Sequence, residues 1–400
     1  MLAKCLLATS LAMLATSVQA AEVSPVPGPS RFPTCESSPT APVCRMEIAK
    51  FPSLKEGGQA WLDGDLLYIS YKGDAKQVVL AGDFVPEPLP LVGQGEWLRV
   101  LRIKDPAQIR LRPMLMVTGP SGLLPPQQLD VAGPGYVRPK IVRPQEGQKT
   151  IVVESKHLQA SRQLKLYFSP NYSAGVPART IYVGDGNIPL AWGMATGADH
   201  GGLPPFVVVG VVPCEGPATK DRMSCRNLEY ENVPVSQKGD PQKFAAHERF
   251  FIEEVIPAIE KEFNVSKKAA DRAIAGSSGA GDWAASMAIR HPEYFSRAIV
   301  MSPSYGMYDR VTRGKPLPPM NFVVGVFEPD ITRSTECLSG TVADAGATVS
   351  IEHLPYGHSM EMWGAAFRKH AAAWLKGQPV APTVGVKRGA ECRGLDEFNG

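Results

Sequence analysis

A cluster of small residues around two adjacent serines is the clearest chemical signal in the chain. Residues 271–283 run from a short apolar segment through Gly-Ser-Ser-Gly-Ala-Gly into a helical pattern. A serine at a sharp strand-to-helix turn forms a nucleophile elbow, whose strained backbone requires small residues two positions before and after it. Gly276 and Ala280 meet this requirement for Ser278, and the register centred on Ser277 is also sterically possible. The pattern predicts a nucleophilic serine, with a simple helix-capping turn as the alternative.

Two polar loops downstream could complete the chemistry of an activated serine. The predicted strand at residues 321–326 leads into Glu328 and Asp330, and the strand at 348–354 leads into His358. In α/β-hydrolases the order along the chain is serine, acid, histidine, and open α/β sheets bind ligands beyond the carboxyl ends of their strands. We therefore expect His358 to act as a base with Glu328 or Asp330 behind it. A surface or structural histidine is the alternative.

The elements around these residues predict an α/β sheet. Residues 150–155 and 162–169 form a leading β-pair, and further apolar strands are expected at 180–183, 206–212, 297–301, 321–326 and 348–354. Asp240 and Pro241 predict the cap and first turn of a helix that ends near Phe263. Strands that alternate with helices indicate a mostly parallel sheet with helices on both faces.

Residues 60–135 have a different pattern, of short β-rich runs separated by turn residues. This spacing predicts a small all-β sandwich of the early-set or immunoglobulin-like kind. The expected organisation is a signal peptide at 1–20, an extended Pro/Ser-rich lead-in at 21–52, the β-sandwich at 53–136, a linker at 137–149, the α/β-hydrolase catalytic domain at 150–377 and a C-terminal tail at 378–400.

The N-terminal residues and the cysteines indicate export. Lys4 precedes an apolar run at 5–16, and small residues around Ala20 follow, as in a secretory signal peptide. Cleavage there leaves an even number of cysteines, which suits an oxidising compartment. Sequence alone allows 15 pairings of six cysteines. Close spacing favours Cys35–Cys44 and Cys214–Cys225, which leaves Cys337–Cys392.

Composition excludes several other classes of protein. The net charge of +3 comes without a basic run, so nucleic acid is not an expected partner. No further apolar stretch is long enough for a membrane helix. The sequence has no C-x-x-C and no H-E-x-x-H motif, so neither a metal nor another cofactor is expected.

An ordered set of motifs adds a family resemblance over about residues 150–376. The residues that carry it are Glu154, Ser155, Leu158, Arg162, Tyr167, Pro170, Tyr172, Tyr182, Asp185, Gly186, Arg226, Glu229, Tyr230, Ala275, Gly276, Ser277, Ser278, Gly281, His291, Pro292, Phe295, Met301, Ser302, Pro303, Ser304, Glu328, Pro329, Gly357, His358 and Trp363. Together they resemble the putative-esterase family of α/β-hydrolases, which includes esterase D, feruloyl esterases and enterochelin esterases. The N-terminal region resembles the β-sandwich of enterochelin esterases, through residues 78–84.

The resemblance implies a register and a set of roles. It selects Ser278 as the nucleophile and favours Glu328 over Asp330 as the acid. The backbone N–H of Gly279 should be one oxyanion donor, because it follows the nucleophile. The second donor is expected in the loop after residues 180–183, at Gly186 or Asn187. Arg226 and Trp283 are candidates for substrate contact, with an ion pair between Arg226 and Glu229 and a packing role for Trp283 as the alternatives.

The sequence thus predicts a secreted or periplasmic serine esterase. A siderophore-type trilactone and an acylated carbohydrate are the two candidate substrates. A catalytically silent hydrolase-like binding protein and an acyltransferase of the same fold are the alternatives, since fold alone does not imply function.

Overall fold

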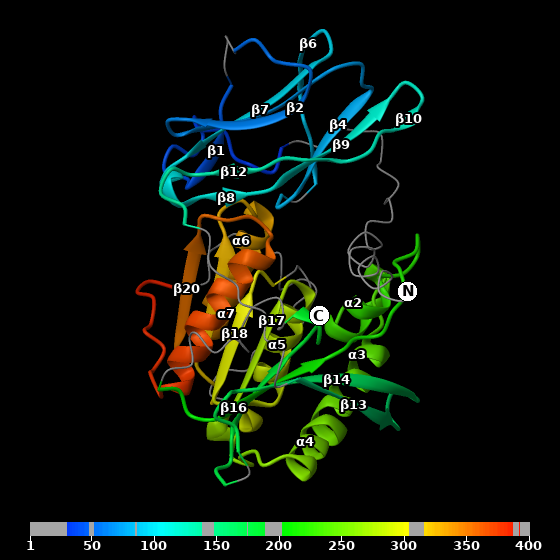
Figure 1. Ribbon diagram of the computed structural model, residues 1–400, viewed down its shortest axis with the longest axis vertical. Coiled ribbons are helices and arrows are strands. Elements are labelled where there is room, and N and C mark those ends of the chain that lie inside the picture. Colours follow the sequence, from blue (N-terminus) through cyan, green and yellow to red (C-terminus); the bar gives the residue numbers. More distant parts are fainter. Residues whose placement is uncertain are drawn as a thin grey trace, which may run out of the picture.

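The computed structural model describes residues 30–47, 52–84, 86–137, 148–173, 175–188, 202–303, 316–386 and 392. The expected signal peptide and most of the expected linker lie outside these residues. Figure 1 shows two parts, an N-terminal region of short strands stacked above a larger α/β part.

The N-terminal region consists of antiparallel strands in two main sheets. One sheet has the order β1 (Val43–Arg45), β7 (Glu96–Ile103), β3 (Leu66–Lys72), β2 (Gly57–Asp63), with β6 (Leu91–Gly93) beside β7. The other has the order β10 (Gly122–Leu123), β9 (Pro113–Gly119), β4 (Gln77–Gly82), β5 (Glu87–Pro88), with β11 (Gln127–Gln128) beside β9. A short pair joins β12 (Val131–Ala132) to β8 (Arg110–Leu111). One hydrophobic cluster contains side chains of both main sheets, so the sheets share a core.

This core begins earlier in the chain than expected. Val43–Arg45 pairs with Ile103–Leu101, and Phe32 is buried in the shared cluster. Part of the expected lead-in therefore belongs to the β region, because its apolar side chains pair and pack there and do not remain extended in solvent.

The α/β part is built on one eight-stranded sheet. Its order is β13 (Gln148–Ser155), β14 (Ala160–Phe168), β16 (Phe206–Val211), β15 (Arg179–Val183), β17 (Arg272–Ser277), β18 (Arg297–Met301), β19 (Met320–Gly325), β20 (Val349–Leu354). The pairs from β16 to β20 are parallel, and β13 and β14 add an antiparallel edge. The carboxyl end of β20 points toward the N-terminal region (Figure 1).

Helices cover both faces of this sheet. The inner strands from β15 to β19 are buried on both sides and so form continuous apolar runs in the sequence. One hydrophobic cluster includes α3 (Pro241–Arg249), η5 (Phe250–Val255), α4 (Ile256–Glu262), α5 (Gly279–Arg290) and α6 (Pro329–Asp344). The other is built around α7 (Met360–Leu375). The short helix α2 (Cys225–Tyr230) packs beside α3 and α5, and single 3₁₀ turns lie at Pro106–Gln108, Val235–Gln237, Ala269–Asp271 and Pro292–Tyr294.

The helix predicted from Asp240 is present, with one irregularity. The Asp240 side chain accepts a hydrogen bond from the Lys243 N–H at 3.1 Å, as an N-cap should. Between α3 and α4 the turn η5 is π-helical. Pro257, in the first turn of α4, has no N–H to donate back into the preceding turn, which accounts for the change in pitch.

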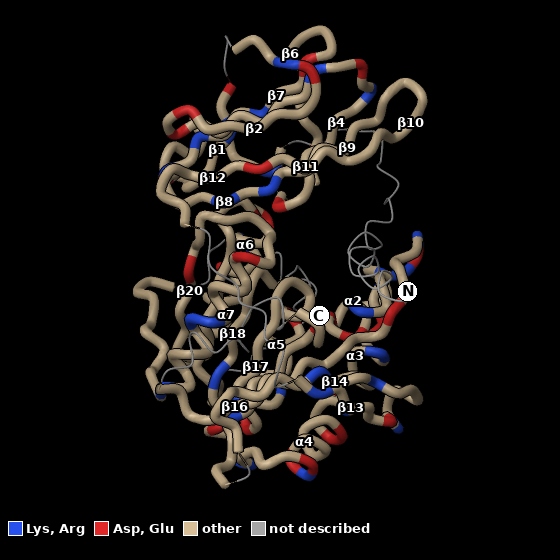
Figure 2. The backbone as a smooth tube through the Cα atoms, in the orientation of Figure 1, with Lys and Arg blue, Asp and Glu red and all other residues tan. Residues whose placement is uncertain are grey.

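The three expected cysteine pairings are present. They are Cys35–Cys44, Cys214–Cys225 and Cys337–Cys392. Within the described part of the chain, no helix is long and apolar enough to cross a membrane. In Figure 2, basic and acidic residues are interspersed along the backbone.

A buried histidine in the main core makes the stability of the protein depend on pH. His247 is fully buried against Tyr230, Phe250 and Trp283, and neither ring nitrogen has a hydrogen-bond partner among the described residues. Burial lowers the pKa of His247 from 6.5 to about 4, although the Glu229 carboxylate acts in the opposite direction.

The lowered pKa predicts a specific acid sensitivity. As the pH falls below 6.5, the unfolded chain takes up the proton first, so stability is lost between pH 6.5 and 4 by on the order of 3 kcal/mol. His247→Phe keeps an aromatic ring but cannot titrate. We expect this variant to lose about 3 kcal/mol less than the wild type over this pH range, measured by urea unfolding. An unchanged pH dependence would contradict the assignment.

Candidate active site

Ser278 occupies a strained turn between β17 and α5. Its φ is 55° and its ψ is −136°, which is rare for a residue with a side chain. Its N–H donates to the Met301 carbonyl at 2.9 Å. A Cβ on Gly276 would lie 1.8 Å from the Ala280 carbonyl oxygen, so no larger residue fits there. The local geometry is that of a nucleophile elbow centred on Ser278.

The alanine at position 280 is accommodated by a neighbouring glycine. Ala280 is buried, and its Cβ lies 2.7 Å from where a Cβ on Gly184 would be. Gly184 follows β15, the strand beside β17. The absence of a side chain at position 184 therefore makes room for the methyl group that replaces the commoner glycine two residues after the serine.

A histidine and a carboxyl group lie behind the serine hydroxyl. His358 Nε2 is 3.2 Å from Ser278 Oγ, and His358 Nδ1 is hydrogen-bonded to Glu328 Oε1. Glu328 follows β19 and His358 follows β20, so two neighbouring parallel strands deliver them to the same edge of the sheet. The ring centroids of His358 and Trp363 lie 4.6 Å apart, with the two ring planes at 90°. This contact limits how the imidazole can turn.

The second oxygen of Glu328 is also held. Glu328 is fully buried, and its Oε2 accepts hydrogen bonds from the Gly325 N–H at 2.7 Å and from Ser302 Oγ at 2.8 Å. Ser302 Oγ accepts in turn from Trp363 Nε1 at 3.0 Å. Ser302 matched a family motif in the sequence, but nothing in its spacing indicated that it would hold the acid.

The other acidic candidate points elsewhere. Asp330 forms an ion pair with Arg31 of the N-terminal region. It occupies the first turn of α6, two residues after Glu328. The structure thus brings Glu328, and not Asp330, against the imidazole.

Of the expected oxyanion donors, the Gly279 N–H is available to a substrate and the Gly186 N–H is already hydrogen-bonded. Gly279 begins α5, where backbone N–H groups lack helical partners, and no hydrogen bond among the described residues uses its N–H. The Gly186 N–H donates to the Val211 carbonyl at 2.9 Å, so the prediction of Gly186 as a donor is wrong. The chain turns back onto β16 there. Asn187 is exposed in the same loop.

Arg226 lies near the elbow, but its partner differs from the one expected. It forms two hydrogen bonds of 2.6 Å to Asp185, and it contacts Asn227 Oδ1 at 2.9 Å. Against the effect of burial, Asp185 raises the pKa of Arg226 above its ordinary value. A Cβ on Gly279 would lie 3.0 Å from Arg226 Nη1, which places the guanidinium next to the residue after Ser278.

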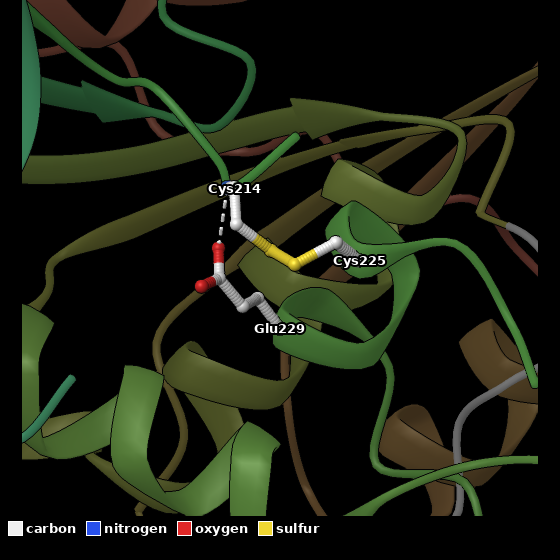
Figure 3. A group of neighbouring side chains, drawn as sticks. All are labelled: Cys214, Cys225 and Glu229. Atoms are coloured by element: carbon white, nitrogen blue, oxygen red, sulfur yellow. Dashed lines mark hydrogen bonds between the residues drawn. A yellow bond between two sulfur atoms is a disulfide. The ribbon is translucent and has the colours of Figure 1, made fainter. Parts of the chain in front are cut away.

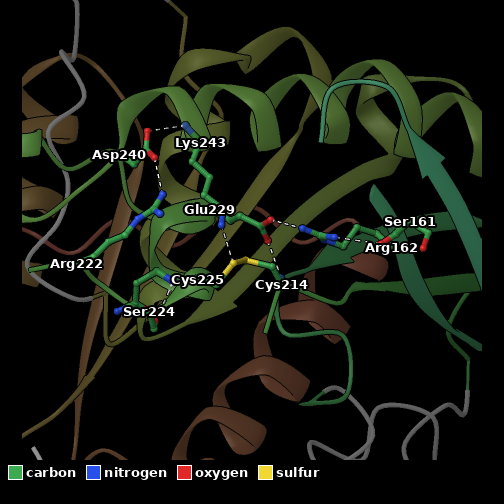
Figure 4. The surroundings of a disulfide bond; sticks show 10 residues. Ser161, Arg162, Cys214, Arg222, Ser224, Cys225, Glu229, Asp240 and Lys243 are labelled. Carbon is green, nitrogen blue, oxygen red and sulfur yellow. Dashed lines mark hydrogen bonds and ion pairs between the residues drawn. A yellow bond between two sulfur atoms is a disulfide. The ribbon is translucent and has the colours of Figure 1, made fainter. Parts of the chain in front are cut away.

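Glu229, which was the alternative partner for Arg226, binds other groups and holds helix α2. Glu229 accepts from the Cys214 N–H at 2.8 Å (Figure 3) and from Arg162 Nη2 at 2.5 Å (Figure 4). The disulfide Cys214–Cys225 fastens the start of α2, and Lys243 reaches Cys225 Sγ at 2.6 Å (Figure 4). Both sulfurs are in the disulfide, so this group of Cys214, Cys225 and Glu229 offers no thiolate to a metal ion. Its effect is to fix α2, and with it Arg226.

Trp283 lies in the core and not in the site. It is fully buried on α5 and packs against Tyr230, His247 and Phe251. The packing alternative describes its surroundings. Because the side chain is fully buried, it offers no surface for the expected substrate contact.

A further carboxyl group lies beside the nucleophile elbow, and no sequence motif predicted it. Glu231, one residue beyond α2, is 5% exposed, and its Oε1 has no hydrogen-bond partner among the described residues. That oxygen lies 2.7 Å from where a Cβ on Gly279 would be. Burial raises the pKa of Glu231 to about 7, although the guanidinium of Arg226 acts in the opposite direction.

Comparison with known proteins identifies the family. A family model described as putative esterase matches residues 155–388, more than half of the chain. No curated protein sequence matches the chain. An enterobactin esterase from Shigella flexneri, solved in the presence of enterobactin, has a similar structure, with a TM-score of 0.56 and 16% identity over 81% of this chain and 97% of that one. A ferric enterobactin esterase from Salmonella typhimurium has a TM-score of 0.55 and 13% identity over 80% and 96%.

These likenesses show an α/β-hydrolase-like fold with an N-terminal β region. The structural similarity covers a larger share of the chain than the family model does, so it extends beyond the α/β part. The chain belongs to the putative-esterase family and is a carboxylic ester hydrolase.

Proposed function

We propose that the chain is an exported serine esterase in which Ser278, His358 and Glu328 carry out the reaction. The observation that carries the proposal is the unbroken series of contacts from Ser278 Oγ through the imidazole to a buried carboxyl group. A serine hydroxyl needs an adjacent base to become a nucleophile, and the base needs a third group that orients it.

The mechanism follows from this series. His358 Nε2 removes the proton from Ser278 Oγ while the oxygen attacks the ester carbonyl carbon. The carbonyl oxygen becomes an oxyanion, for which the free N–H of Gly279 is one donor and Asn187 the remaining candidate for the second. The imidazolium then protonates the leaving alkoxide as its bond to carbon breaks, and a water molecule hydrolyses the acyl-enzyme by the reverse proton transfers.

The substrate class we favour is a siderophore-type trilactone, ahead of an acylated carbohydrate. The supporting fact is that the likeness to the enterobactin esterases includes the N-terminal β region as well as the α/β part. A screen of nitrophenyl esters, acetyl and feruloyl sugars and catecholate siderophores tests this. Hydrolysis of sugar esters alone would select the second class, and product formation with an alcohol in preference to water would indicate an acyltransferase.

We also propose the organisation expected from the sequence, with a removable segment at 1–20, a β-sandwich and a catalytic domain. The three disulfides suit an oxidising compartment. In a Gram-negative host the mature protein should be found outside the cytoplasm and begin at Ala21, as intact mass spectrometry would show. A full-length chain that stays in the cytoplasm with free thiols would contradict export.

Labelling by a fluorophosphonate tests the nucleophile. We expect the wild type to be labelled at Ser278 and Ser278→Ala to lose both labelling and about 10⁴-fold or more in kcat. Ser277→Ala is the matched control, because it removes the neighbouring hydroxyl and should remain labelled. Labelling of a folded Ser278→Ala variant would overturn the assignment, and absence of labelling in the wild type would favour a silent binding protein.

Separate substitutions distinguish the two acids. Glu328→Gln keeps the size of the side chain but cannot stabilise an imidazolium, so we expect kcat to fall about 10³–10⁴-fold. Asp330→Asn removes the charge that pairs with Arg31 and should change kcat by about twofold at most, since partly exposed ion pairs contribute little. The reverse order of effects in steady-state kinetics would make Asp330 the acid.

A further inference from the structure

The loop that carries His358 is attached to the N-terminal β region. The backbone N–H of His358 donates to the carbonyl of Asp83 at 2.8 Å. A Cβ on Gly357 would lie 1.9 Å from the same carbonyl oxygen, so glycine is required for this close approach. A short parallel bridge between Arg110 and Tyr356 adds a second backbone contact.

The loop that carries Glu328 is attached to the same region by packing. Phe327, immediately before the acid, is fully buried in the hydrophobic cluster of the two N-terminal sheets. Its ring centroid lies 5.7 Å from that of Phe84, and the Phe84 centroid lies 6.2 Å from that of Phe32, both in edge-type contacts. The Phe327 N–H donates to the Tyr356 carbonyl at 3.1 Å, so the acid and histidine loops are also joined to each other.

Asp83 is itself held firmly. Its Oδ2 accepts from the Arg112 N–H at 2.8 Å, and its own N–H donates to the Arg112 carbonyl at 3.4 Å. It is 6% exposed, and burial raises the pKa of its carboxyl to about 6. The carbonyl that receives the His358 N–H therefore belongs to a fixed point of the β region and not to a loose turn.

We propose that Asp83 and Phe84 are positioning residues for the esterase reaction, and that the N-terminal β region is an integral part of the active site. The inference rests on the proposed function. Asp83 fixes the position of His358 through the hydrogen bond to its backbone carbonyl. Phe84 fixes the position of Glu328 by packing against Phe327, the residue before the acid. Two consecutive residues thus position both partners of the serine.

The geometry leaves little tolerance for displacement. Proton transfer from Ser278 to His358 takes place across 3.2 Å, and a displacement of about 1 Å can reduce turnover about 10²-fold. Asp83 and Phe84 are buried, so neither side chain offers surface to a substrate. Loss of either support should therefore lower kcat far more than it raises KM.

The experiment uses the full chain and a nitrophenyl ester. In Phe84→Ala we expect kcat to fall about 10–100-fold while KM changes by about threefold or less, and Phe84→Leu should restore most of the loss. Val78→Ala is the matched control. It truncates a fully buried side chain of the same cluster, at the opposite end of β4, and should leave kcat within about twofold.

Gly357→Ala provides an independent variant that acts on the backbone contact. It should lower kcat by a similar factor. The double variant Phe84→Ala/Gly357→Ala should lose less than the product of the two single losses, because the two supports come from adjacent residues and the acid and histidine loops are joined by the bond from Phe327 to Tyr356. If Phe84→Ala does not fold, Gly357→Ala carries the comparison with Val78→Ala.

The outcomes separate this inference from the proposed function. Folded Phe84→Ala and Gly357→Ala variants with wild-type kcat, in a protein whose Ser278 is labelled by fluorophosphonate, would overturn the inference alone. An equal loss of kcat in Val78→Ala would also overturn it, since general destabilisation would then explain the effect. A wild type without Ser278-dependent labelling or hydrolysis would overturn both.

Discussion

Burial of the Glu328 carboxyl group is the constraint on which the rest of the site depends. A carboxyl group removed from water costs several kcal/mol unless its oxygens are hydrogen-bonded. Here Ser302, the Gly325 N–H and His358 supply those bonds. They come from the ends of β18 and β19 and from the loop after β20, so the acid can be buried only when three parallel strands end at one edge.

The same burial explains why the acid needs the N-terminal region. Phe327 precedes Glu328 directly and is buried in a core outside the α/β part. The β region supplies that core, and the acid is thereby drawn into the junction between the two parts. The Glu328 carboxyl group is thus held by hydrogen bonds within the α/β part, while the adjacent Phe327 ring is held in the apolar core of the N-terminal region. Together these contacts fix the backbone between the two residues.

Local patterns predicted the elements and the strand ends that carry the key side chains, whereas the choice of Ser278 over Ser277 and of Glu328 over Asp330 came from the family resemblance. The Gly-Ser-Ser-Gly run, the strand ends before Glu328 and His358, and the cap at Asp240 each depend on neighbours within a few residues. The structure brings Ser278 and His358 into contact at 3.2 Å, as the strand-end argument expected. Apolar runs of the same local kind predicted the strands that form the sheet. Close spacing favoured Cys35–Cys44 and Cys214–Cys225, and Cys337–Cys392 was the pair that remained.

What could not be predicted depends on contacts between distant segments. The Gly186 N–H is used by Val211, and Trp283 faces the core, because sheet and helix packing decide both. The bond from His358 to Asp83 joins residues 275 positions apart by a backbone carbonyl, which any residue type could provide. Glu231 likewise gains its raised pKa only from burial, which its sequence neighbours do not indicate.

The first disulfide has a consequence beyond the stability of the segment that it closes. Cys35–Cys44 ties the residues that follow Phe32 to β1, and Phe32 is the outermost ring of the series that ends at Phe327. Formation of this disulfide therefore holds Phe32 in place, at one end of the series of aromatic contacts whose other end is Phe327, next to Glu328. In the protein with reduced thiols, packing alone holds these three rings together. We therefore expect formation of the disulfide to be a maturation step for catalysis as well as for folding.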